Sequence, residues 1–234
     1  MNFPRFLLIA LLLSSLSGAT NAQVPPKTVL LNEIGDPQCE FLWAALDHLR
    51  AEILNKPGSF ATVEISGVTG DPRGNFYWEA FIRNHLARYT PKASWAIHRT
   101  AVGSDRRVKL WLTPPGGDPP KINVAEWSFI YPPDTKPFVF SNGGEDHSVK
   151  SGVCLYVDEI RLLANALREN PEARLNVVLI VPSDRAYRRR RANTLRMLTR
   201  EYSISPSHIR IFRKLDTKPD PHDLEPDAEY WFVP

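Results

Sequence analysis

The chain has 234 residues, of which 43% are hydrophobic and 24% are charged, and its formal net charge at pH 7 is +3. This hydrophobic content is enough for packed cores, which excludes a chain that is disordered throughout. The nearly balanced charge disfavours a general nucleic-acid-binding protein, because such proteins are usually strongly basic.

The N-terminal segment is typical of a secretory signal. A basic residue, Arg5, precedes an apolar run from Phe6 to Leu13, and small and polar residues follow up to Ala22. We therefore expect residues 1–22 to be a signal peptide and the protein to be exported to the periplasm or cell envelope. We expect no transmembrane segment, because no apolar run reaches the roughly 20 residues that a spanning helix needs. The alternative is an uncleaved anchor in the membrane interface.

The rest of the chain predicts strands that alternate with helices, in the same order twice. The segments of the first half are a strand at 28–32, a helix at 39–55, a strand at 61–66, a helix at 76–89 and strands at 95–101 and 107–112. Those of the second half are a strand at 137–140, a helix at 154–170, a strand at 176–181, a helix at 186–202 and strands at 208–212 and 229–233. Such alternation predicts layered α/β units.

Short sequence motifs repeat in the same order. Asn55-Lys-Pro57 mirrors Asn170-Pro171, and Leu-Trp-Leu-Thr-Pro at 110–114 mirrors Tyr-Trp-Phe-Val-Pro at 230–234. The first helix of each half carries apolar residues at helical spacings of three and four, which gives it one apolar face. We predict an α/β fold (an α+β sandwich) of two tandem β-α-β-α-β units, 23–113 and 137–234, with the helices packed on one face of each sheet.

Residues 114–136 are predicted to be a proline-rich linker between the units. Within it Trp127, Phe129 and Tyr131 fall at a period of two, which predicts a short strand with three aromatic rings on one surface. We favour the interpretation that the rings cover an open sheet edge or an interface. The alternative is a platform on which carbohydrate stacks.

The second half carries the motifs of a known family. They are the helix end Asn170-Pro171, the strand at 177–180, Arg191-Ala192 in the next helix, and the segment from Ile204 to Ile211. This order resembles the OmpA-like domain, the peptidoglycan-binding C-terminal domain of OmpA and MotB. The first half shows the same pattern in its segments 55–57, 63–67 and 79–83. The resemblance therefore indicates a divergent, duplicated OmpA-like domain.

The resemblance implies a ligand, the carboxylate-bearing stem peptide of peptidoglycan. In the family, this peptide is held by an aspartate in the loop after the central strand and by an arginine of the next helix. These positions correspond to Asp71 and Arg83 in the first unit and to Arg191 in the second, where the shorter loop carries Asp184 in a shifted position. A guanidinium pairs bidentately with a carboxylate, and a helix N-terminus adds a favourable dipole.

Arginines are concentrated in the last predicted helix. It carries Arg185, Arg188, Arg189, Arg190, Arg191, Arg196 and Arg200. Consecutive arginines point around most of a helix, so they cannot all face one ligand. One interpretation is a solvated face. The other is a binding patch, with Arg188 and Arg191 as candidate residues, for an anionic wall polymer, lipid head groups or an acidic partner.

Sequence patterns of catalysis and metal binding are absent or weak. No Gly-x-Ser-x-Gly, His-Glu-x-x-His, glycine-rich phosphate loop or Cys-x-x-Cys motif occurs in the sequence. The stretch 220–227 offers oxygen and imidazole groups, but its prolines and acids are equally those of a solvated loop. We expect no metal, no cofactor and no enzymatic activity.

The sequence contains two cysteines, Cys39 and Cys154. In an exported protein a disulfide is the default expectation. The two residues fall at nearly equivalent positions of the two units, and equivalent positions can meet across a pseudo-twofold axis. We predict a disulfide that joins the units; the alternative is two separately buried thiols.

Together these patterns predict a non-enzymatic exported protein of the cell envelope that binds peptidoglycan or another anionic envelope component. The alternative is a structural or protein-interaction module whose ligand site has decayed. We expect the partner to be peptidoglycan or an envelope protein, and we expect no binding of nucleic acid.

Overall fold

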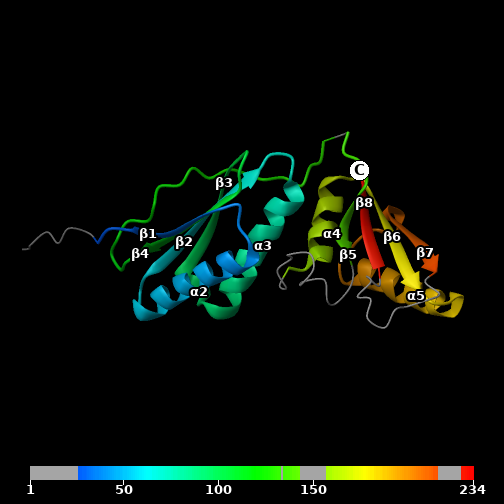
Figure 1. Ribbon diagram of the computed structural model, residues 1–234, viewed down its shortest axis with the longest axis horizontal. Coiled ribbons are helices and arrows are strands. Elements are labelled where there is room, and N and C mark those ends of the chain that lie inside the picture. The colour runs from blue at the N-terminus through cyan, green and yellow to red at the C-terminus, as the bar shows by residue number, and fades with distance from the viewer. Residues whose placement is uncertain (1–25, 133, 143–156, 216–227) are drawn as a thin grey trace, which may run out of the picture.

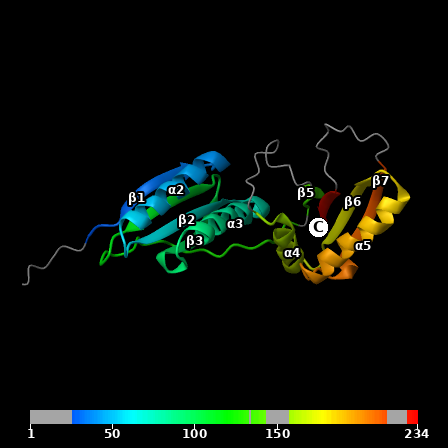
Figure 2. The same cartoon turned by 90° about the horizontal axis from the view of Figure 1, so that it is seen from below.

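The computed structural model describes residues 26–132, 134–142, 157–215 and 228–234, which form two successive units (Figures 1 and 2). In this part of the chain each unit has two α-helices and a four-stranded mixed sheet. The predicted fold class is thereby confirmed. Among the described helices none is long and apolar enough to cross a membrane.

The first unit follows the predicted order of elements. They are β1 (Val29–Gly35), α2 (Cys39–Asn55), β2 (Phe60–Val68), α3 (Pro72–Tyr89), β3 (Trp95–Gly103) and β4 (Arg107–Thr113). The sheet order is β1-β4-β2-β3, in which β4 is antiparallel to both neighbours and β2 is parallel to β3. A short 3-10 turn at Lys92–Ser94 leads into β3.

The second unit repeats this arrangement. Its elements are β5 (Phe138–Asn142), α4 (Glu159–Glu169), β6 (Arg174–Val181), α5 (Asp184–Arg200), β7 (Ile209–Leu215) and β8 (Ala228–Val233). The sheet order β5-β8-β6-β7 has the same strand directions, and a 3-10 turn at Pro206–His208 leads into β7. The predicted helix at 154–170 begins later, at Glu159, and residues 154–156 lie outside the described ranges.

Irregularities of the sheets are repeated as well as their order. In the first unit the register of β1 against β4 shifts by one residue between Leu30 and Asn32. In the second unit the same shift separates Val139 from Ser141 in β5. The strand residues before the two shifts face Trp111 and Trp231, the tryptophans of the repeated motif. A bulge at the same place in both copies indicates that the units are structural repeats.

Each core follows from residue spacing. In α2, Leu42, Leu46, Leu49 and Ile53 recur at spacings of four, three and four and are all buried. In β2, alternate residues beginning at Ala61 face the same helices, because side chains of a strand alternate between its two faces. The apolar helix stripe and the apolar strand face therefore meet and exclude water.

The linker differs from the prediction, because the described residues between 114 and 136 contain no strand. The chain there runs beside β3, where Ala125 N–H donates to Arg99 O at 2.9 Å and the indole of Trp127 donates to Thr100 O at 2.8 Å. One backbone bond is too few for a ladder. The rings of Trp127, Phe129 and Tyr131 are buried. The structure therefore supports the covering interpretation over an exposed carbohydrate platform.

Rings of the linker join the two units. Phe76 of α3 stacks on Phe129 with ring centroids 4.0 Å apart and lies edge-on to Trp127 at 6.1 Å. Tyr77, the next residue of α3, belongs to the hydrophobic core of the second unit. Val157, just before α4, packs against both cores. The first unit is thus anchored to the second by α3 and the linker together.

Polar contacts fix the same linker to the end of α4. Asn170, the C-cap of α4, donates to Ala166 O at 2.7 Å and to Phe129 O at 2.8 Å, and its Oδ1 accepts from Tyr131 N–H at 3.1 Å. Glu169 accepts from Phe129 N–H at 2.7 Å. One asparagine therefore satisfies a helix end and two linker groups.

This junction predicts that Phe76→Ala destabilises the protein by about 2 to 4 kcal/mol, because the ring fills the space between α3 and two linker aromatics. Urea unfolding followed by tryptophan fluorescence measures the change. The control is Phe41→Ala, since Phe41 of α2 is 66% exposed. Equal stability of the Phe76 variant and the control would contradict the assignment of the junction.

Candidate ligand-binding site

The loop between β2 and α3 places Asp71, a predicted ligand-binding residue, at the start of α3. Gly70 has a φ of +81°, a conformation that favours glycine, and it turns the chain toward the helix. Asp71 is the N-cap, and its Oδ1 accepts from Gly74 N–H at 2.9 Å. Pro72 follows at the first helical position, where its missing N–H is tolerated. This Asp-Pro sequence is a usual helix start.

Arg106, just before β4, is the partner of Asp71. Its Nη2 donates to Asp71 Oδ2 at 2.6 Å and to Asn75 Oδ1 at 3.1 Å. Arg106 is only 7% exposed, and its buried Nε has no hydrogen-bond partner within the described structure. The side chain of Asn75 also hydrogen-bonds to both backbone groups of Val68. It accepts from Val68 N–H at 2.7 Å and donates to Val68 O at 2.9 Å. These residues form a polar cluster that holds the ends of β2, α3 and β4 together.

Two glycines make room for this cluster. A Cβ on Gly67 would lie 2.7 Å from Asn75 Cγ. A Cβ on Gly74 would lie 2.6 Å from Arg106 Nη2 and would overlap Asp71 Oδ2. Real side chains do not approach so closely, so the close packing of Asp71, Asn75 and Arg106 depends on the absence of side chains at both positions.

A hollow of about 240 Å³ opens beside the cluster. It lies at the start of α3, which is next to α4 (Figure 1). Its lining residues are Asp71, Arg73, Gly74, Tyr77, Trp78, Arg106 and Glu159. All come from the first unit except Glu159, which is the first residue of α4. The hollow therefore lies at the junction of the units and needs both of them.

Charges of both signs line this hollow. Arg73 Nη2 lies 3.1 Å from Glu159 Oε1, and its guanidinium lies over the ring of Phe140, 5.3 Å from the centroid. With Asp71 and Arg106, two carboxylates and two guanidinium groups face one small space. Burial raises the pKa of the nearby Tyr131 phenol far above its ordinary value, so this group stays neutral beside the charges. Such a site suits a small ligand that carries both an ammonium and a carboxylate.

The structure does not bring Arg83, the second predicted ligand-binding residue of the first unit, to the hollow that Asp71 lines. Arg83 lies three turns further along α3, about 18 Å away along the helix axis. It pairs with Glu79, one turn earlier, at 2.7 Å, and Glu79 is held from the other side by Arg99 at 2.8 Å. Because Glu79 is buried, it needs these cationic partners, and the need explains where Arg83 points.

Sequence reasoning missed Arg106, Arg73 and Glu159. Arg106 follows the turn between two strands, where arginine is common, and no motif marks it. Glu159 belongs to the other unit and reaches the site only through the docking of α4 on α3. The only signal in the sequence was the pair Gly67 and Gly74, which pack against Asn75, Asp71 and Arg106. A glycine indicates such close packing only when the neighbouring residue is already known.

The second unit arranges the corresponding loop differently. Ser183 is the N-cap of α5 and accepts from Ala186 N–H at 3.2 Å. Asp184 is the first helical residue, and it is ion-paired with Arg213 of β7 rather than with Arg188 or Arg191. Arg188 and Arg191 are exposed on α5. The predicted ligand-binding set of the second unit is therefore not assembled into one site.

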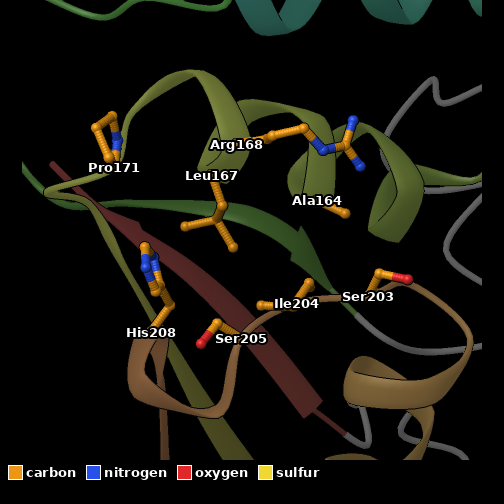
Figure 3. A pocket seen from close by; sticks show the side chains of 8 residues that line it. All are labelled: Ala164, Leu167, Arg168, Pro171, Ser203, Ile204, Ser205 and His208. Atoms are coloured by element: carbon orange, nitrogen blue, oxygen red, sulfur yellow. The ribbon is translucent and has the colours of Figure 1, made fainter.

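Another hollow of the second unit, about 250 Å³ in volume, lies between α4 and the turn before β7 (Figure 3). Leu167 and Ile204 point toward each other across its floor, and the guanidinium of Arg168 extends away from His208 along α4 (Figure 3). Arg168 Nη1 donates instead to Asn165 Oδ1 at 3.0 Å. Since its polar groups do not converge, this hollow is a weaker candidate than the one at α3.

Within the described ranges, no group of three or more His, Cys, Asp or Glu side chains could hold a metal ion. The stretch 220–227 lies outside these ranges. His85 is the most buried histidine described here, and it lies 3.2 Å from Asp47 where α3 packs on α2. Burial lowers its pKa, although the charge of Asp47 acts in the opposite direction. We assign it to helix packing.

Comparison with known proteins gives no relative: no protein family, no curated protein and no solved structure matches the chain. The OmpA-like resemblance therefore stays a prediction, and the hollow at α3 rests on its own geometry.

Cys39 begins α2 and packs against the core of the first unit, whereas Cys154 lies outside the described residues. Val157, three residues after Cys154, contacts the same core. We predict that a digest of the unreduced protein contains a Cys39–Cys154 peptide pair, detected by mass spectrometry. Loss of this bond is expected to lower stability by about 4 to 5 kcal/mol in the chain-entropy account. Alkylation of both cysteines without reduction would show that the bond is absent.

A second prediction concerns Gly74. Gly74→Ala should displace the Asp71–Arg106 pair and destabilise the protein by about 1 to 2 kcal/mol, because overpacking outweighs the better helix propensity of alanine. The control is Gly103→Ala, where a Cβ would meet nothing within 4 Å. Thermal unfolding of both variants measures the difference, and a Gly74 variant as stable as the control would show that the cluster is loosely packed.

Proposed function

We propose that the chain is a non-enzymatic protein of the cell envelope whose first unit binds the stem peptide of peptidoglycan in the hollow at the start of α3. One observation carries the proposal. A small space between the two units is lined by two carboxylates and two guanidinium groups, next to the N–H groups of a helix start. The choice of ligand rests on the resemblance to the OmpA-like domain, and the choice of compartment rests on the predicted signal peptide.

The charges of the hollow suit such a peptide. Arg73 is half-buried and lies at the wall of the hollow, where it offers a guanidinium to a ligand carboxylate. The side chain of Asp71 is 47% exposed, so it is open to a ligand ammonium while Arg106 pairs with its other side. Trp78 and Tyr77 offer apolar surface for the aliphatic part of a peptide. A ligand with only one kind of charge would leave half of these groups without a new partner.

A binding role fits these residues better than catalysis. Both carboxylates of the hollow are already ion-paired with arginine. No serine, threonine, cysteine, histidine or lysine is among the residues that line it. The lining thus contains no serine, threonine or cysteine nucleophile with a histidine or lysine base, and each of its two carboxylates is held by an arginine.

The same ion pairs favour a second candidate function. If Arg73–Glu159 serves only to hold the units together, and Asp71–Arg106 only to fix the loops of the first unit, the protein is a structural or protein-interaction module without a wall ligand. The two functions differ in whether the purified protein binds peptidoglycan at all.

Sedimentation with insoluble peptidoglycan tests the proposal. We expect the wild type to sediment with it and Asp71→Asn to bind at least tenfold more weakly, because asparagine keeps the helix cap but removes the charge. The matched control is Asp158→Asn, the same change at the N-cap of α4, which does not line the hollow. Arg83→Ala should also bind like the wild type, since Arg83 lies outside the hollow.

Two results would contradict the proposal. A wild type that does not sediment with peptidoglycan would favour the interaction module. Equal binding by all four proteins would mean that the wall is bound elsewhere on the molecule.

A further inference from the structure

Helix α5 carries a row of arginines on the side turned away from its core. We call this row the arginine stripe. It consists of Arg185, Arg189, Arg196 and Arg200. At about 100° per residue these four lie within about 60° of the helix circumference, and they span about 22 Å along its axis. All four are exposed, whereas Thr194 and Leu198 on the opposite side are buried.

The stripe has no acidic partner among the described residues, unlike seven other described arginines. Within the described ranges, ion pairs are formed by Arg73, Arg83, Arg99, Arg106, Arg107, Arg161 and Arg213. No ion pair between the stripe and the described residues occurs. The acidic residue of α5, Asp184, is ion-paired with Arg213. The positive charge of the stripe is therefore not neutralised by the described surface around it.

This arrangement weakens the helix that carries it. Arg185 and Arg189 are four residues apart, as are Arg196 and Arg200, and like charges at this spacing repel each other on a helix. Arg185 also lies in the first turn of α5, where the helix dipole disfavours positive charge, whereas the same dipole favours Arg200 in the last turn. A face that needs only solvation is served better by mixed charges. The stripe thus indicates an anionic partner that compensates for the repulsion.

We propose that the arginine stripe binds the surface of a bilayer that contains anionic phospholipids, with α5 parallel to the surface. Each guanidinium pairs bidentately with a lipid phosphate. Both views show α5 at the outside of the second unit, where it extends from beside α4 to the end of the unit that is remote from the first (Figures 1 and 2). Ala192 is the only apolar residue on the same side of α5 as the stripe. The contact is therefore electrostatic, and α5 does not insert into the bilayer.

This inference concerns a different surface from the hollow at α3 and goes beyond the proposed function. A protein with both sites would hold a peptide of the wall by its first unit and a membrane surface by its second. Each site is tested without the other, because the vesicles used below contain no peptidoglycan.

Flotation of the purified protein with vesicles tests the proposal. One set of vesicles is phosphatidylcholine alone, and the other contains about one third phosphatidylglycerol. We expect binding to the anionic vesicles at low salt, little binding at high salt and none to neutral vesicles. A variant with all four stripe arginines changed to glutamine keeps the helix propensity. It should bind more than a hundredfold more weakly, since each basic residue near such a surface contributes a factor of about five.

The matched control loses the same charge elsewhere. It replaces four exposed lysines, Lys27, Lys92, Lys121 and Lys136, with glutamine. It should keep most of the binding, and the stripe variant should unfold at a higher temperature than the wild type because repulsion is removed. Equal loss in both variants would mean that net charge alone acts, and undiminished binding by the stripe variant would place the contact elsewhere. Binding of soluble polyphosphate through the stripe without binding to vesicles would also overturn the proposal.

Discussion

Stacking of Phe76 on Phe129 is the contact on which the arrangement of the two units depends. It joins α3 to the linker, and the linker is in turn held by Asn170 at the end of α4. Because the candidate hollow takes most of its walls from α3 and one carboxylate from α4, this contact also determines whether the hollow exists. The hollow therefore exists only while the two units are docked, and a ligand bound in it would stabilise the docked arrangement.

The two repeats preserve their sheets and differ in their loops. The bulge, the tryptophan register and the 3-10 turn recur in both. The loop before α3, however, has glycines and Asp71, whereas the shorter loop before α5 has Ser183 as its cap. The second unit, with its shorter loop, has no counterpart of the polar cluster among its described residues. The two units are thus similar scaffolds, and differences at one helix start give them different surface chemistry.

The sequence was informative about elements and poor about pairings. Spacings such as Leu42 to Ile53 predicted the helices, and the repeated Trp-containing motif predicted the strands, because both signals are local. Arg83 lies outside the hollow and pairs with Glu79, and nothing local in the sequence shows that Glu79 is buried. The linker aromatics predicted a strand by their period of two, but prolines and the single backbone bond to β3 leave an extended segment. Contacts between distant residues, such as Arg73 with Glu159, have no local signature.

The covering of β3 by the linker has a consequence for association between molecules. Strands at the edge of a sheet expose unpaired N–H and C=O groups, onto which a strand of another chain can add. In the first unit the chain protects β3 with its own linker. The corresponding edge strand, β7, instead carries exposed Arg210, Arg213 and Lys214. The edge strand of the first unit is thus protected by a covering segment and that of the second unit by charge. Because salt screens exposed charges, high ionic strength should make β7 the more prone to self-association.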